Sequence, residues 1–198
     1  MSDLPPHIHL ASASPRRAEI LDVLGVSYTM AGTDIDEQPL AGEAADRMVI
    51  RLAAGKALAA SQQHDGVILA ADTAVVLDDA VFGKPLDQDD ALEMLARLSG
   101  CNHQVMTGVA VHWNEEQRVA LSTTEVRFRE IHPDEALAYW QSGEPRGKAG
   151  AYAIQGLAGT FVEEIKGSFS GVVGLPVFET AALLAEAGID LLKRTATQ

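Results

Sequence analysis

Residues 67–71, with the sequence VILAA, constrain the fold more than any other segment of the chain. An apolar run of this length, without polar alternation, predicts a strand that is buried on both faces, as in the sheets of α/β proteins. The run is followed directly by Asp72 and Thr73. Ligands bind at the carboxyl ends of such strands, so Asp72 is a candidate to hold a metal ion or to accept a proton from water. The alternative is an aspartate that only caps a turn.

The rest of the chain alternates strand and helix patterns and shows no repeat and no linker. It therefore predicts one mixed α/β unit over residues 1–198. The loop 142–159 is rich in Gly and Ala, and we expect it to serve function rather than packing. Further strands are predicted at residues 8–12, 26–30, 74–77, 81–82, 104–113, 119–129 and 161–165, and helices at 16–24, 44–61, 87–100, 133–141 and 176–187.

The charge of the chain limits its partners. A formal net charge of -13 argues against nucleic acid and against an anionic membrane surface. It does not argue against a small phosphorylated substrate, which needs only a local basic cluster, often with a divalent cation. Cys101 is the only cysteine, so no intramolecular disulfide can form, and a reducing cytoplasm is the expected location. The chain shows no secretory signal pattern and no apolar run of the roughly 18 residues that a membrane span needs.

A strand, a turn of small residues and a helix start meet near the N-terminus. Ser14 suits the N-cap and Pro15 suits the first helical turn. Backbone N–H groups at a helix start attract anions, and the forked donors of Arg16 and Arg17 match phosphate oxygens. The segment therefore predicts a phosphate site, although an ordinary capped helix with two solvated arginines fits the same residues.

Other charged residues are weaker candidates. Asp34, Asp36 and Glu37 provide the hard oxygen ligands that Mg²⁺ or Mn²⁺ prefers, and Lys56 and Lys84 could each reach a phosphate. Solvated surface residues are the simpler interpretation for all five.

Several familiar motifs are missing. The six histidines are scattered, and we expect them to be structural or surface residues. The sequence contains no dinucleotide-binding glycine motif, no P-loop and no nucleophile elbow of a serine hydrolase.

Ten short segments, taken in order, resemble the Maf family of nucleoside triphosphate pyrophosphatases. The resemblance covers nearly the whole chain. The segments are residues 12–17 (SASPRR), 36–37 (DE), 56–57 (KA), 71–73 (ADT), 83–85 (GKP), 98–100 (LSG), 103–105 (HQV), 148–152 (KAGAY), 154–156 (IQG) and 173–176 (VGLP).

This resemblance implies a fold and a reaction. The fold is a Maf/ITPase-like pair of α/β lobes around an elongated mixed sheet, with a central cleft. The reaction is hydrolysis of a nucleoside triphosphate to the monophosphate and pyrophosphate, with Mg²⁺ or Mn²⁺, in the cytoplasm. A homodimer is also implied. The implied roles are proton acceptor for Asp72, metal binding for Glu37 and Asp72, and phosphate binding for Ser14, Arg16, Arg17, Lys56 and Lys84. Whether Asp72 acts chiefly as base or as metal ligand stays open.

The resemblance also implies a subgroup. Members that prefer dTTP and UTP carry the residue types found here as Arg17, Thr73 and Gln155, and a Gln amide can pair with the edge of a pyrimidine. Ala13 departs from the family, where Gly is common. One alternative is a pyrophosphatase for 7-methyl-GTP, inosine-type or other non-standard nucleotides. The other is a regulatory binding protein, because the family name comes from an association with septum formation.

Overall fold

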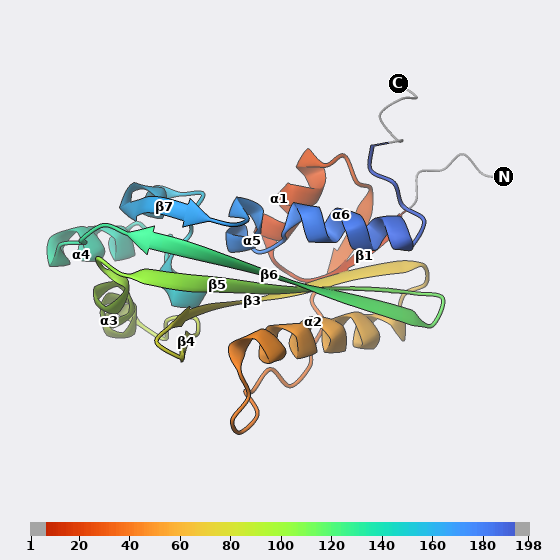
Figure 1. Ribbon diagram of the computed structural model, residues 1–198, viewed down its shortest axis with the longest axis horizontal. Coiled ribbons are helices and arrows are strands. Elements are labelled where there is room, and N and C mark those ends of the chain that lie inside the picture. The colour runs from red at the N-terminus through yellow and green to blue at the C-terminus, as the bar shows by residue number, and fades with distance from the viewer. Residues whose placement is uncertain (1–6, 193–198) are drawn as a thin grey trace.

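The computed structural model describes residues 7–192, which form one seven-stranded sheet with helices on both faces (Figure 1). The strands are β1 (Ile8–Ala11), β2 (Tyr28–Ala31), β3 (Val67–Leu77), β4 (Ala80–Phe82), β5 (Asn102–Trp113), β6 (Glu116–Phe128) and β7 (Val162–Lys166). The helices are α1 (Pro15–Val23), α2 (Ala45–Ser61), α3 (Gln88–Leu98), α4 (Pro133–Gln141), α5 (Phe169–Val173) and α6 (Val177–Glu186), with 3₁₀ turns η1 (Ala149–Ala151) and η2 (Leu157–Phe161).

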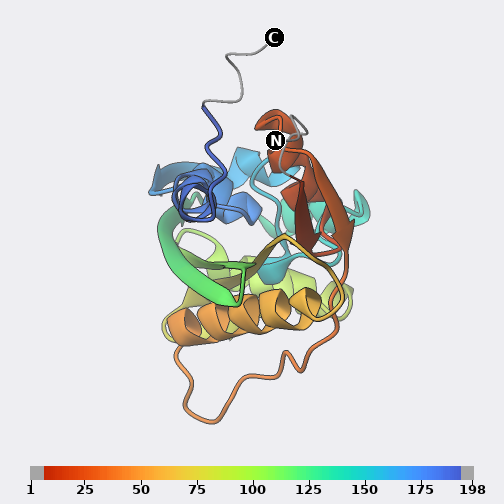
Figure 2. The same cartoon turned by 90° about the vertical axis from the view of Figure 1, so that its right-hand side faces the viewer.

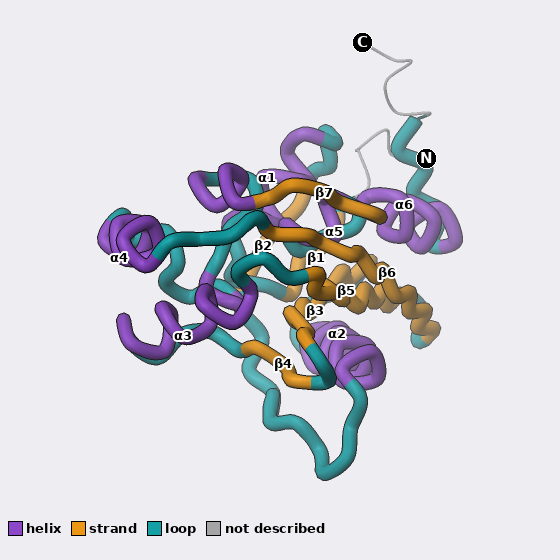
Figure 3. The backbone as a smooth tube through the Cα atoms, turned by 60° about the vertical axis from the view of Figure 1, so that its left-hand side comes forward, coloured by secondary structure: helices purple, strands orange, loops and turns teal. Residues whose placement is uncertain are grey.

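The sheet is mixed, as the family resemblance implies. Its order is β2-β1-β3-β5-β6-β7, with β4 paired to the far end of β3. β1 runs parallel to β2 and β3, whereas β3, β5, β6 and β7 pair in antiparallel fashion. The long strands β3, β5 and β6 cross the whole molecule and connect its two ends (Figures 1 and 3).

The two faces of β3 pack against different helices, because successive side chains of a strand point to opposite sides. Ile68 and Ala70 lie with Ala53 and Ala57 of α2 in one buried cluster. Leu69 and Ala71 face the other way and belong to the cluster that contains residues of α1 and α6. Figure 2 shows α2 along one face of the sheet and α6 on the opposite side. The apolar run at 67–71 is therefore buried on both faces, as predicted.

A separate core fills the other end of the long strands. It is centred on Phe128 of β6, which is fully buried and packs edge-on against the rings of Phe161 and Tyr152. Helices α3 and α4 cover this end (Figure 3). Several members of this cluster, among them Val75, Phe82 and Tyr152, line the cavity described below.

β3 differs from the prediction in one respect that matters for the site. We expected a strand end at Asp72, but β3 continues unbroken from Val67 to Leu77. It continues because β5 pairs with it from Ile68 to Val76 and keeps the backbone extended. On its other edge β1 pairs only as far as Leu69, and β4 begins at Val75. Within residues 7–192, the edge of β3 between these two partners has no neighbouring strand, so Asp72 lies beside the carboxyl end of β1 rather than at the end of its own strand.

The loop 142–159 is also different from the expectation. Tyr152, Ile154 and Ala158 are buried parts of the core around Phe128, so the segment serves packing as well as function. The Glu144 carboxylate holds it in shape, because it accepts hydrogen bonds from Tyr139 Oη and from the backbone N–H groups of residues 157 and 158.

The histidines have structural surroundings, as expected. His103 is buried, its Nε2 lies 2.9 Å from the hydroxyl oxygen of Tyr152, and burial lowers the pKa of its ring to about 4. His9 stacks on the ring of His64, a contact that their spacing in the sequence does not reveal. In the part of the chain that the structure describes, no helix combines the length and the apolar character that crossing a membrane requires.

Candidate active site

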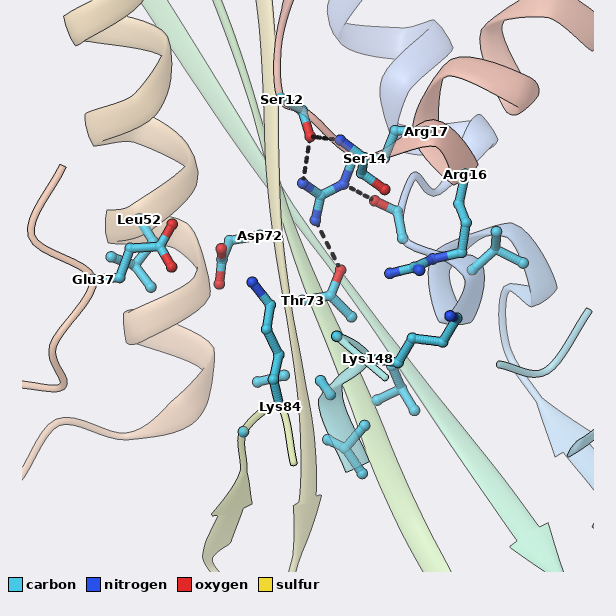
Figure 4. A pocket seen from close by; sticks show the side chains of 18 of the residues that line it. Ser12, Ser14, Arg16, Arg17, Glu37, Leu52, Asp72, Thr73, Lys84 and Lys148 are labelled. Carbon is cyan, nitrogen blue, oxygen red and sulfur yellow. Dashed lines mark hydrogen bonds between the residues drawn. The ribbon is translucent and has the colours of Figure 1, made fainter. Parts of the chain in front are cut away.

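A cavity of about 690 Å³ opens at the unpaired edge of β3, a volume typical of small-molecule sites. It reaches both faces of the strand, because no neighbouring strand closes that edge. All nine residues to which the family resemblance assigns a role line it: Ser14, Arg16, Arg17, Glu37, Lys56, Asp72, Thr73, Lys84 and Gln155. Figure 4 shows Glu37 and Asp72 on one side of β3, and Arg17 and Thr73 on the other.

On the α2 side, one lysine bridges two carboxylates. Lys56 Nζ lies 2.6 Å from Glu37 Oε1 and 2.7 Å from Asp72 Oδ1. The side chains of Lys56 and Asp72 are only 10% and 15% exposed, whereas that of Glu37 is 52% exposed. Two carboxylates face one ammonium group, so the cluster keeps an excess negative charge next to the cavity. We call Glu37, Lys56 and Asp72 the acidic cluster.

Lys56 reaches this position because it lies on the buried stripe of α2. Its neighbours on that stripe are Leu52 and Ala53 one turn earlier and Ala60 one turn later, all of them buried. A surface lysine, the simpler interpretation of the sequence, is therefore wrong for this residue. The helix can approach the sheet closely because Gly108 of β5 has no side chain, and a Cβ there would collide with the Val49 backbone.

Glu37 comes from the loop between β2 and α2, which passes alongside α2 in Figure 2. The hydrogen bond from Lys56 lowers the pKa of Glu37 below its ordinary value, partial burial opposes this, and the charges of Lys84 and Arg17 add to the lowering. Glu37 is therefore ionised at neutral pH. Asp34 and Asp36 do not line the cavity, and the Asp36 carboxylate accepts a hydrogen bond from the Gln38 backbone instead.

On the other side of β3, the Arg17 guanidinium is held by neutral groups. It donates to the Gly174 carbonyl at 2.8 Å, to Ser12 Oγ at 3.1 Å and to Thr73 Oγ1 at 3.4 Å (Figure 4). Gly174 has a φ of 127°, and a Cβ there would lie 3.5 Å from Arg17 Nε. Glycine thus allows the end of α5 to approach the arginine with a backbone conformation that other residues rarely adopt.

Thr73 continues this network into the sheet. Its hydroxyl lies 3.0 Å from that of Thr107, the residue directly opposite on β5. Thr107 is fully buried and donates its own hydroxyl to the Gly171 carbonyl at 2.8 Å. We call Arg17, Thr73, Thr107 and the Gly171 carbonyl the hydroxyl network.

The start of α1 differs in detail from the expected cap. Ser14 occupies the N-cap position, but its side chain makes no capping hydrogen bond. Ser12 organises the turn instead, because its Oγ accepts from the Ser14 backbone N–H as well as from Arg17. The first turn of α1 therefore faces the cavity without a side-chain cap over its N–H groups.

Four cations of the cavity have no carboxylate within ion-pair distance among residues 7–192. One is Arg17, which neutral acceptors hold, and the others are Arg16, Lys84 and Lys148. Lys148 was not among the residues predicted for the site, although the sequence marks its loop as functional. Burial and then the nearby charge of Arg16 lower the pKa of Lys148. Two cations of like charge that lie close together favour an anionic ligand between them.

The residues of the acidic cluster fit a divalent cation that arrives with a phosphorylated substrate. Mg²⁺ is usually bound by one or two carboxylates together with substrate phosphates and water, rather than by a cage of protein groups. Glu37 and Asp72 provide two converging carboxylates. Over residues 7–192, no group of three or more His, Cys, Asp or Glu side chains is arranged to hold a metal on its own.

Comparison with known proteins shows the family of the chain. The sequence profile described as "Maf-like protein" matches residues 7–187. The chain belongs to the Maf family. A dTTP/UTP pyrophosphatase of Hahella chejuensis is 50% identical over 186 residues, which are 92% of this chain and 92% of that protein. A dTTP/UTP pyrophosphatase of Methylococcus capsulatus is 48% identical over 182 residues, with 91% and 90% covered. Among solved structures, a HAM1 protein from Coxiella burnetii has 19% identity and a TM-score of 0.46, over 62% of this chain and 73% of its own.

In this Maf-family chain, two contributors to the site were missed by sequence reasoning. Lys148 lies in the loop 142–159, far from Arg16 in the sequence. Their proximity is therefore visible only in the folded chain. Thr107 carries no sequence signal, because it is one hydroxyl residue within a strand.

Proposed function

We propose that this Maf-family chain is a nucleoside triphosphate pyrophosphatase that converts dTTP and UTP to the monophosphate and pyrophosphate. The observation that carries the proposal is the cavity at the edge of β3, in which a carboxylate pair lies opposite cations without acidic partners. The relatives, about 50% identical over more than 90% of the chain, support the choice of substrate.

In this proposal the cations hold the triphosphate. Arg16, Lys84 and Lys148 lack carboxylate partners among the described residues, so the phosphate oxygens become their partners. Lys56 donates to the two carboxylates and keeps a third N–H for a phosphate oxygen, since an ammonium group has three donors. The uncapped N–H groups at the start of α1, next to Ser14, add a further anion site.

Glu37 and Asp72 would hold Mg²⁺ or Mn²⁺ together with the substrate. Such a cation neutralises charge on the phosphates and polarises the phosphorus that is attacked. Lys56 keeps the carboxylates ready for this role, because its hydrogen bond lowers the pKa of Glu37 and so favours the ionised form.

Asp72 orients the attacking water and accepts its proton. The water oxygen forms a bond to the α-phosphorus, the bond to the bridging oxygen of the β-phosphate breaks, and pyrophosphate leaves with that oxygen. Phosphoryl chemistry of this kind depends mostly on positioning and on charge stabilisation. Asp72 suits the role because Lys56 and the strand backbone on both of its sides fix it at the edge of β3.

Thr73 and Gln155 are proposed to select the base. Both line the cavity, and Gln155 is exposed there, so its amide is free to pair with a ligand. One amide offers a donor and an acceptor, which suits the alternating groups on the edge of uracil or thymine.

The test is pyrophosphate release by the purified protein with Mg²⁺ or Mn²⁺ from dTTP, UTP, CTP, GTP, 7-methyl-GTP and ITP. We expect the highest kcat/KM for dTTP and UTP. A preference for 7-methyl-GTP or ITP would keep the reaction and overturn the base. No release from any of the six would contradict the enzymatic proposal.

The remaining expectations are proposals as well. They are a single domain with two lobes over residues 1–198, a cytoplasmic location and assembly as a homodimer. Gel filtration with light scattering tests the last of these, because a monomer at micromolar concentration would contradict it.

A further inference from the structure

The hydroxyl network has a direction that the positions of its acceptors fix. A hydroxyl group has one proton to donate and two lone pairs to accept with. Thr107 lies 2.8 Å from the Gly171 carbonyl oxygen, which can only accept, so the Thr107 proton points at that carbonyl. Because this proton is used, the 3.0 Å contact between Thr73 and Thr107 needs the proton of Thr73. The Thr73 proton therefore points into the sheet.

The opposite side of the Thr73 oxygen faces the cavity. One of its lone pairs accepts from Arg17 at 3.4 Å, and the other is left for a ligand. In this arrangement Thr73 has no proton to offer to the cavity. A ligand that approaches its oxygen must bring its own donor.

We propose that Thr107 is a specificity-determining positioning residue that makes Thr73 a pure hydrogen-bond acceptor and thereby selects bases with an N–H group at that point. Thr107 does not line the cavity and is fully buried, so it acts only through Thr73. The inference rests on the proposed function for its substrate class, since it concerns how the same site recognises a base.

Uracil and thymine carry the required donor, the N3–H of the imide group. Cytosine has the same shape but carries an acceptor at N3, which would face the lone pair of Thr73. A site built for a donor rejects the analogue that lacks it, because two acceptors are then left facing each other without a proton. The network therefore explains discrimination between UTP and CTP without an added bulky group.

The experiment compares Thr107→Val with Thr107→Ser. Valine keeps the shape of the side chain and removes the acceptor for the Thr73 proton, whereas serine keeps the hydroxyl. The readouts are kcat and KM for UTP and CTP, and the Kd of UMP and CMP by calorimetry. Circular dichroism and the Tm establish that each variant is folded.

We expect Thr107→Val to lower the UTP:CTP ratio of kcat/KM by about 10- to 100-fold, the size of one mispaired buried hydrogen bond. The UMP:CMP binding ratio falls with it, because the Thr73 proton is released toward the cavity and can now pair with cytosine N3. Thr107→Ser retains both ratios. Unchanged ratios in folded Thr107→Val, or equal losses in both variants, would overturn the proposal.

A second variant keeps the test decisive if Thr107→Val does not fold. Thr73→Val removes the acceptor itself, so UTP and UMP should weaken while CTP and CMP do not. Selective weakening of CTP and CMP would mean that Thr73 acts as a donor, and equal weakening of both bases would mean that Thr73 does not discriminate between them; either result contradicts the network. A wild-type protein that cleaves no triphosphate contradicts the proposed function alone. In that case the ratio of UMP to CMP binding in Thr107→Val tests the role of Thr107. Wild-type protein that binds neither monophosphate would overturn this inference too.

Discussion

The two faces of β3 at the cavity present opposite kinds of chemistry one residue apart. Asp72 points to the α2 side and enters the acidic cluster, whose members are charged and held by ion pairs of 2.6 and 2.7 Å. Thr73 points to the other side and enters the hydroxyl network, in which Arg17 is held by uncharged acceptors. The period of two along a strand thus separates the acidic cluster from the hydroxyl network within a single cavity. Under the proposed function, the acidic cluster is the reacting side and the hydroxyl network is the recognising side.

The two sides also differ in how firmly they are fixed. Glu37 is half exposed and comes from a loop, so the acidic cluster can adjust when a substrate and its cation arrive. Thr107 is a fully buried residue of β5 that donates to the Gly171 carbonyl of α5, so the hydroxyl network is in place before any ligand binds. If this contrast is correct, a change on one side should affect turnover and a change on the other should affect the choice of base.

The largest effect is expected from Asp72→Asn. The amide is isosteric with the carboxylate but cannot accept the proton of water, so kcat for UTP should fall roughly 10²- to 10⁴-fold. The Tm should stay within a few degrees. Asp34→Asn is the matched control, because Asp34 does not line the cavity. Near-normal turnover in folded Asp72→Asn would contradict the proposed role of Asp72 as proton acceptor.

A large but less direct effect is expected from Gly108→Ala. Its Cβ would collide with the Val49 backbone, so α2 must move away from the sheet and carry Lys56 with it. We expect a loss of about 1–3 kcal/mol in the free energy of unfolding, together with a lower kcat. The UTP:CTP ratio should stay unchanged, because the hydroxyl network does not depend on α2.

Gly55→Ala is the control for that variant. Gly55 lies within α2, and a Cβ there would meet only the end of the Ile35 side chain at 3.3 Å. Alanine also favours the helix more than glycine does. Urea unfolding and steady-state kinetics on both variants check the prediction. Equal destabilisation by the two substitutions would show that the close approach at Gly108 is unimportant.

An effect on selectivity is expected from Gln155→Glu. The carboxylate loses the amide donor, so dTTP and UTP should weaken by about tenfold or more relative to GTP. The cost to stability should be small, because Gln155 is exposed. Gln141→Glu adds the same charge at an exposed position outside the cavity and should leave the rates unchanged. If Gln155→Glu and wild type had identical relative rates across the nucleotide panel, the proposed role of Gln155 in selecting the base would be contradicted.

The smallest effect is expected in the pH dependence of stability, through Glu37 of the acidic cluster. The pKa of Glu37 is lowered in the folded protein, so its contribution to stability is complete above the ordinary pKa of glutamate. That contribution is lost as the pH falls through the lowered value. Because Glu37 is half exposed, we expect Glu37→Gln to cost no more than about 1 kcal/mol at pH 7. In urea unfolding at several pH values, the difference in the free energy of unfolding between Glu37→Gln and wild type should disappear in acid. A difference that grows in acid would contradict this prediction.

The sequence was sufficient for most elements and for nine of the residues that line the cavity. The apolar run at 67–71 predicts a strand that is buried on both faces, because this signal is local. The ten motifs predict the family, because they form an ordered set along the chain. The strand end expected at Asp72 was wrong, since pairing with β5 keeps the backbone extended beyond that residue. Tertiary contacts decide where a strand ends, and they cannot be read from local polarity.

The partners of the site residues were beyond sequence reasoning. Lys56 was expected on the surface unless it bound a phosphate, but the helical stripe on which it lies faces the sheet. Thr107 is 34 residues away from Thr73, and only the register between β3 and β5 places them opposite each other. Residue types identify the chemistry available to a chain, whereas long-range pairing decides which groups meet.

The continuous course of β3 through the cavity makes alignment itself a requirement for function. One residue inserted before Asp72, in a strand that stays regular while its register with β5 shifts by one, would turn its carboxylate toward Arg17 and the following threonine toward Lys56. Both side chains would still be present in a folded sheet. Under the proposed function, however, the base would meet the carboxylate and the triphosphate would meet the hydroxyl. Length is therefore as tightly constrained in this segment as the identity of its residues.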